Sequence, residues 1–121
     1  MTRRLLLVAV GGAVGTLARH AVAELFGDSS TWPWPTFTVN LVGSFLLGVL
    51  AAKVVDPADP RRLLLGTGVL AGFTTYSAFA VETDLLLRDA DLLIGVLYPT
   101  VTVALGLAAA VAGLVAGRRT A

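Results

Sequence analysis

The stretch "AGFTTYSAFAVET", residues 71–83, decides how this chain is expected to fold. It interrupts an apolar run, about residues 63–87, that is long enough to cross a membrane. Four hydroxyl side chains stand in a row at its centre: Thr74, Thr75, Tyr76 and Ser77. Hydroxyl groups compete with the helix for backbone hydrogen bonds, and the glycine just before them adds flexibility. The sequence therefore predicts a membrane helix that is broken near residues 71–77.

The chain is too apolar for a soluble domain of its size. Of its 121 residues, 56% are hydrophobic and 14% are charged, and a small soluble domain cannot bury that much apolar surface. It has no cysteine, which excludes disulfides and thiolate metal sites. A net charge of +1 leaves no large basic field, so we expect no nucleic-acid partner. We expect an integral membrane protein whose apolar surface is covered by the lipid bilayer.

Four apolar segments are long enough to span the membrane as helices, which takes roughly 20 residues each. Their expected limits are 5–26, 37–55, 63–87 and 92–116. Short polar connections separate them: "GDSSTWPWPT", "DPADPRR" and "RDAD". Each contains proline or aspartate, which are typical of turns and loops. The predicted fold is an all-α integral membrane domain over residues 1–121, with four transmembrane helices, the third one broken.

Glycine pairs recur at the four-residue spacing that lets helix backbones approach closely in lipid. They occur in the first, third and fourth segments: Gly11 and Gly15, Gly68 and Gly72, Gly113 and Gly117. Four short helices make a thin bundle. An internal polar path would be easier to enclose with a second copy of the chain or with a homologous partner.

Several polar side chains lie at depths where lipid would penalise them unless they face protein or water. Asn40 could make a hydrogen bond between helices, or line a pore and donate its amide to an anion. Arg19 could reach the interface, pair with Glu82, or form an electropositive vestibule. His20 and Glu24 are four residues apart on one helix face, which favours a surface pair over a metal site.

The broken segment has the features of an ion site. Broken membrane helices occur where the freed backbone lines a cavity or is buried in protein. They expose N–H groups that suit anions and carbonyl groups that suit hard cations. Tyr76 and Phe79 are three residues apart and would share one helix face, either as packing or with their electropositive ring edges turned toward a small anion.

Three motifs resemble those of the Fluc (CrcB) fluoride channel family. The stretch "GGAVGTLARH" is similar to the family's glycine-rich stretch that ends in arginine. The stretch "TFTVNLVGSFLLG" is close to T-x-x-x-N-x-x-G-S-F-x-x-G, and "GVLAGFTTYSAFAVET" resembles G-x-x-G-G-x-T-T-F-S-T-F-S-x-E. Three such motifs, in this order in a four-helix chain, form a specific signal that covers nearly the whole sequence.

The resemblance implies passive export of fluoride from the cytoplasm, which lowers its toxicity, through a dimer of antiparallel subunits with two narrow pores. It implies that Asn40 donates its amide to fluoride and that Tyr76 and Phe79 occupy two aromatic box positions. The other pore residues that it implies are Thr75, Ser77, Thr102 and Arg19. The setting that it implies is a bacterial plasma membrane.

The resemblance also implies a structural sodium ion at the dimer centre, bound by the backbone carbonyls of Ala71 and Thr74 and by those of the partner. The chain departs from the family pattern at two of these positions. Tyr76 stands where phenylalanine is usual, which adds a hydroxyl to the pore lining. Ala71 replaces the first glycine of a pair, and a positive φ there would cost energy.

The basic residues are distributed unevenly along the predicted topology. Seven of the nine fall on the side of the N-terminus: Arg3, Arg4, Lys53, Arg61, Arg62, Arg118 and Arg119. Arg88 is on the opposite side, and Arg19 lies in the first helix. The positive-inside rule then predicts cytoplasmic termini. A chain with one orientation cannot readily form its own antiparallel dimer, which favours a separately encoded homologue as partner; pairing with itself stays open.

Two other functions and an enzymatic role are weaker hypotheses. A small four-helix exporter of cationic compounds needs a carboxylate deep in its first helix, where this chain has only Glu24, near the end. A non-conducting structural subunit would need no ion path, whereas Asn40 and the hydroxyl run suggest one. No pattern of a nucleophile and a base, or of metal ligands, suggests an enzyme.

Overall fold

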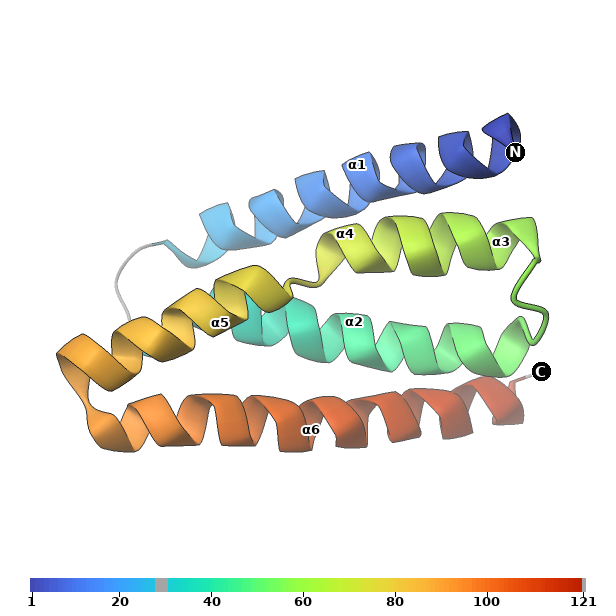
Figure 1. The fold of residues 1–121 in the computed structure, drawn as a ribbon. Coiled ribbons are helices and arrows are strands. Elements are labelled where there is room, and N and C mark those ends of the chain that lie inside the picture. Colours follow the sequence, from blue (N-terminus) through green and yellow to red (C-terminus); the bar gives the residue numbers. More distant parts are fainter. Residues whose placement is uncertain (28–30, 121) are drawn as a thin grey trace.

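The described residues form a bundle of four long helices, and both ends of the chain lie at one end of it (Figure 1). The structure, a computed structural model, describes residues 1–27 and 31–120. Residues 28–30, in the first expected connection, lie outside the described residues, as does residue 121. The first helix is α1, Thr2–Phe26, and the second is α2, Trp34–Lys53. The fourth is α6, Leu92–Arg119.

The third membrane helix is built from five pieces. These are α3 (Pro60–Arg62), the π-helical η1 (Leu63–Leu70), α4 (Ala71–Phe73), α5 (Tyr76–Leu85) and the π-helical η2 (Leu86–Ala90). Each of the four helices is long and apolar enough to cross a membrane. The predicted all-helical membrane fold is therefore confirmed. The π-helical pieces were not predicted, because hydrophobic periodicity does not distinguish them from α-helix.

Helix α2 begins before, and α6 ends after, the apolar segment from which each was predicted, whereas α2 ends at Lys53 instead of residue 55. α2 begins at Trp34 instead of residue 37, and Pro35 lies in its first turn, where the missing N–H costs nothing. α6 ends at Arg119 instead of residue 116. Long basic side chains such as Arg118 and Arg119 can reach the water interface, so α6 continues past the limit of the hydrocarbon.

The predicted break in the third helix is present between α4 and α5 (Figure 1). Thr74 has φ −77° and ψ 158°, and Thr75 has φ −145° and ψ 122°, so both are extended. The helix restarts at Tyr76, where the side chain of Thr75 caps it by accepting a hydrogen bond from the N–H of Ala78, at 3.2 Å. The hydroxyl run thus both interrupts one helix and starts the next.

Glycines form the closest helix contacts. α1 lies on η1 and α4, and α2 lies on α6. A Cβ added at Gly15 would overlap the carbonyl oxygen of Val69, and one at Gly113 would overlap that of Phe45. In both cases the neighbour is backbone, which cannot move aside like the end of a side chain.

We expect Gly15→Ala to separate α1 from the third helix, at a cost of about 3 kcal/mol, because the added methyl meets a backbone carbonyl. Gly12→Ala is the matched control on the same helix, since a Cβ there meets nothing within 4 Å. The measurement is the temperature at which each detergent-purified variant loses its monodisperse peak in size-exclusion chromatography. Equal melting of the two variants would contradict the assigned contact.

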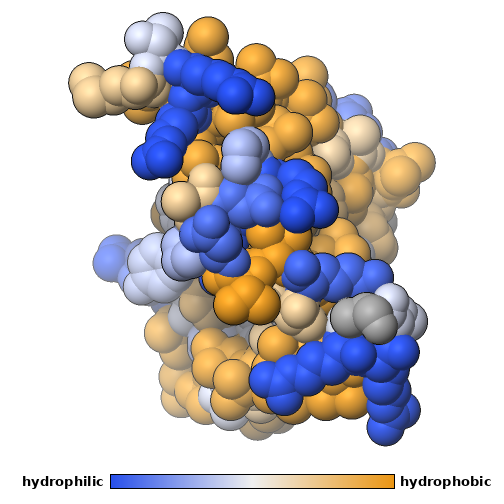
Figure 2. Space-filling model, turned by 90° about the vertical axis from the view of Figure 1, so that its right-hand side faces the viewer, coloured by the Kyte–Doolittle hydropathy of each residue, from blue (hydrophilic) through white to orange (hydrophobic). Residues whose placement is uncertain are grey.

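Little of the chain is buried within the bundle itself. Between 11% and 28% of each helix's most apolar window is buried, so lipid or a partner subunit must cover the rest. Hydrophilic residues gather at the end of the bundle that carries the termini, with apolar residues between and beside them (Figure 2). The molecule thus has the polarity pattern of a membrane-spanning bundle.

Candidate functional site

Asn40 of α2 holds the broken segment through two hydrogen bonds. Its Nδ2 donates to the carbonyl oxygen of Thr75 at 3.0 Å, and the N–H of Thr75 donates to its Oδ1 at 2.8 Å. The side-chain amide thus pairs with extended backbone much as a neighbouring strand would. One N–H of the Asn40 amide is used in this way, and a second one is left.

The same pairing frees a carbonyl group in the third helix. In a continuous helix, the N–H of Thr75 would donate to the carbonyl of Ala71. Here that N–H donates to Asn40 instead. The Ala71 carbonyl therefore lacks its usual helical donor, while Ala71 itself keeps an ordinary helical conformation, with φ −68°. The alanine at this position is consequently unstrained.

A hollow of about 600 Å³ lies beside the break. It brings together seven of the residues predicted for the ion site: Asn40, Ala71, Thr74, Thr75, Tyr76, Phe79 and Thr102. Leu47 and Leu107 are among its apolar walls. The hollow is therefore a mostly apolar space with a few polar groups beside the helix break, which is the usual composition of a ligand site.

A second hollow, of about 660 Å³, lies on the other side of the broken segment. It contains the two remaining predicted residues, Arg19 and Ser77, together with His20 and Thr36. Thr75 lines both hollows, so the break separates them. Among the described residues, no ion pair involves Arg19, and His20 lies 4.0 Å from Glu24 as the expected surface pair.

The predicted pore hydroxyls of Thr75, Ser77 and Thr102, and the neighbouring hydroxyl of Thr74, are engaged in local hydrogen bonds. Thr102 donates to the carbonyl of Tyr98 at 2.6 Å, and Thr74 donates to that of Leu70 at 2.9 Å. The hydroxyls of Thr75 and Ser77 lie 3.3 Å apart. A hydroxyl has one hydrogen to donate, so Thr102 would have to release a backbone carbonyl before it could donate to an anion.

Glu82 forms a polar cluster that the sequence reasoning missed. Thr36 donates to its Oε1 at 2.7 Å, and Tyr98 donates to its Oε2 at 2.8 Å. The cluster joins α2, α5 and α6, and the alternative pairing of Glu82 with Arg19 is not seen. The available signal was the hydroxyl of Tyr98, a few residues into the mostly apolar fourth segment, where it needs a partner when buried.

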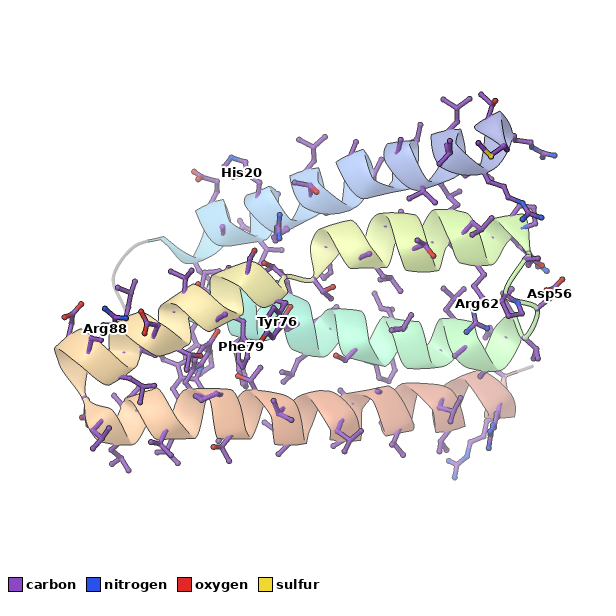
Figure 3. The ribbon with its side chains drawn as sticks, in the orientation of Figure 1. His20, Asp56, Arg62, Tyr76, Phe79 and Arg88 are labelled. Carbon is purple, nitrogen blue, oxygen red and sulfur yellow. The ribbon has the colours of Figure 1, made fainter. Side chains whose placement is uncertain are left out.

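A row of aromatic rings extends from the break to the start of α2. Tyr76 and Phe79 project from α5 to the same side (Figure 3), with ring centroids 6.2 Å apart. Phe79 lies 5.5 Å from Tyr98, which meets Trp32 edge-on at 5.3 Å. Tyr98 is fully buried, whereas Tyr76 is 82% exposed. The ring of Tyr76 therefore has most of its contact surface available to lipid or to a partner.

Comparison with known proteins places this arrangement in a family. The family described as "CrcB-like protein, Camphor Resistance (CrcB)" matches residues 6–114. A protein named "Fluoride-specific ion channel FluC" from a Caulobacter species is 45% identical, over 96% of this chain and 95% of the relative. Its namesake in Caulobacter vibrioides is 42% identical, over 96% of both chains. "Fluoride-specific ion channel FluC 1" of Mycobacterium tuberculosis is 42% identical, over 88% of this chain and 84% of the relative. With four membrane-length helices and a match along nearly its whole length, the chain belongs to the CrcB family of multi-pass membrane proteins.

Proposed function

We propose that this chain is a subunit of a fluoride channel in the bacterial plasma membrane, which lets cytoplasmic fluoride leave passively and so lowers its toxicity. The observation that carries the proposal is the helix break, which Asn40 holds and which lies between two hollows. Fluoride that enters as HF from an acidic medium dissociates inside and is trapped as an anion. A passive pore is sufficient to release it.

The proposed path passes from the hollow at Arg19 to the one at Asn40, with Thr75 between them. The guanidinium of Arg19 attracts the anion at the vestibule. The second N–H of the Asn40 amide then donates to fluoride after it has lost water. Because two bonds to Thr75 already fix the amide plane, this N–H is held in one direction.

Side chains next to Asn40 complete the pore lining. Tyr76 and Phe79 offer ring edges, which carry partial positive charge and stabilise a small anion without a full opposite charge. The hydroxyls of Thr75, Ser77 and Thr102 donate to fluoride when they exchange their local bonds for it. Such exchange keeps binding weak enough for the ion to move on.

A sodium ion is proposed as the structural cofactor, held by the backbone carbonyls of Ala71 and Thr74. The residues fit this role because the Ala71 carbonyl has lost its helical donor to Asn40 and both residues line the same hollow. Oxygen atoms are the ligands that a hard cation prefers. Between two subunits, a sodium ion would attract the carbonyl oxygens of both and so hold the subunits together.

A second, antiparallel subunit is proposed to cover the hollow at Asn40. The hollow is open at the surface of the single chain, and Tyr76, on its wall, is 82% exposed. An inverted subunit would close the pore lining and match Ala71 and Thr74 with their equivalents. The excess of basic residues at one end favours a separately encoded homologue over a second copy.

Liposome efflux, read with a fluoride electrode, tests the proposed function. The purified chain is reconstituted alone and together with an inverted homologue. We expect fluoride to leave at least one of these preparations while chloride stays trapped. Equal loss of both anions, or no fluoride efflux from either preparation, would refute the proposal.

A further inference from the structure

The end of the bundle that carries both termini has more cations than it can pair internally. Hydrophilic residues gather at this end (Figure 2), and Asp56 and Asp59 lie there, in the connection between α2 and α3. Asp59 forms an ion pair with the side chain of Arg61, with an Nη2–Oδ2 distance of 2.9 Å. Hydrogen bonds from Arg61 also hold the pKa of the Asp59 carboxyl below its usual value. Asp56 accepts the N–H of Ala58.

One arginine at this end has a structural task. Arg62 donates from Nη1 to the carbonyl oxygens of Val54 and Val55, at 2.8 and 3.2 Å, and its side chain reaches toward the end of α2 (Figure 3). It thereby supplies donors to the two carbonyls that directly follow the end of α2. Arg61 and Arg62 thus already bind groups of the chain itself. An external anion is therefore expected to bind to other cations at this end.

Three uncommitted cations lie at the adjoining C-terminal ends of α2 and α6. Gly117 lies against Ala52, since a Cβ added to it would come within 2.7 Å of the Ala52 Cβ. The next residues on the two helices are Lys53 and Arg118, followed by Arg119. All three are exposed, and no ion pair or side-chain hydrogen bond in the described part of the chain involves them.

We propose that this basic corner, made of Lys53, Arg118 and Arg119, binds the phosphate headgroup of an anionic membrane lipid. α6 is a membrane-length helix that ends at Arg119, so the corner lies at the depth of the headgroups. Val111 and Val115 precede it on α6 and are 54% and 41% exposed. Val111 and Arg118 are seven residues apart and share one helix face, along which an acyl chain can lie.

The chemistry favours an anionic lipid over a zwitterionic one. A guanidinium forms paired hydrogen bonds with phosphate oxygens, and basic side chains at the membrane surface attract anionic lipids. The same cations also bias insertion of the chain. Insertion depends on the number of cations on each side of the membrane. Headgroup binding depends instead on whether those cations lie together in the basic corner. Variants with equal charge but different positions therefore distinguish the two roles, independently of fluoride conduction.

The test measures lipid retained by the full-length chain in detergent micelles, by native mass spectrometry, with phosphatidylglycerol and phosphatidylcholine of the same acyl chains. Because the protein is already extracted, its orientation in the membrane has no influence. We expect the chain to retain phosphatidylglycerol preferentially. R118Q/R119Q should weaken this binding roughly 30-fold, and K53Q alone about fivefold.

The matched control, R61Q/R88Q, removes the same number of charges from arginines that are already paired, with Asp59 and Asp84. It should retain phosphatidylglycerol as the unmodified chain does. Equal retention of the two lipids by the unmodified chain would overturn the proposal. An equal loss in the two double variants would also overturn it, because net charge and not the corner would then govern binding. If R118Q/R119Q fails to fold, K53Q provides the test instead. Unchanged binding of phosphatidylglycerol by K53Q would then overturn the proposal.

Discussion

Replacement of Asn40 by alanine is expected to stop fluoride conduction. The change removes the proposed donor to the anion and both hydrogen bonds that hold Thr75. A dehydrated anion in an apolar space has no solvent to replace a lost donor. A loss of about 3 kcal/mol at the highest barrier lowers the rate roughly 100-fold. The measurement is fluoride efflux from liposomes that contain the same amount of folded channel.

Two further variants separate the roles of the amide. Asn40→Asp keeps an oxygen that can accept the N–H of Thr75, but it lacks the amide donor and adds a negative charge, so it should fold and not conduct. Ser44→Ala is the control one turn along α2, since Ser44 lines the same hollow and donates only to the carbonyl of Asn40. It should conduct normally. Normal efflux from a well-folded Asn40→Ala channel would refute the assignment.

The second prediction is that the chain expressed alone yields little active channel. Both termini lie at the same end of the bundle (Figure 1), together with seven of the nine basic residues. The opposite end has Arg88 (Figure 3), which pairs with Asp84 at 3.0 Å. This bias should keep the termini in the cytoplasm. An antiparallel dimer then needs a partner that inserts the other way up.

Topology mapping and efflux measurements together test this prediction. A reporter at the C-terminus should be found on the cytoplasmic side only. Fluoride efflux should be low from the singly expressed chain and should rise on co-expression with a homologue of opposite charge bias. If the reporter appears equally on both sides and the lone chain is fully active, the protein is a dual-topology homodimer. Tyr76 would then be a tolerated variation at its box position.

The fold could be predicted from sequence because its determinants are local. The length of an apolar run sets whether a segment can span the membrane, and the four helices were found in this way. The hydroxyl run at Thr74 and Thr75 predicted the break because these side chains compete with the backbone of their own segment. The helix limits were less accurate, because polar residues at helix ends can remain helical beyond the apolar region.

The arrangement of the site depended on contacts between distant parts of the chain. The sequence by itself determined four membrane helices, a break in the third, and polar residues at the depth of that break. Only the tertiary structure decided that the Asn40 amide pairs with the backbone of Thr75, 35 residues away, and that Glu82 binds Thr36 and Tyr98. A polar group in an apolar bundle must find a partner. Which partner it finds depends on how the helices pack, and here glycines bring the helix backbones close together. That geometry cannot be predicted from any single segment, because it depends on contacts between segments.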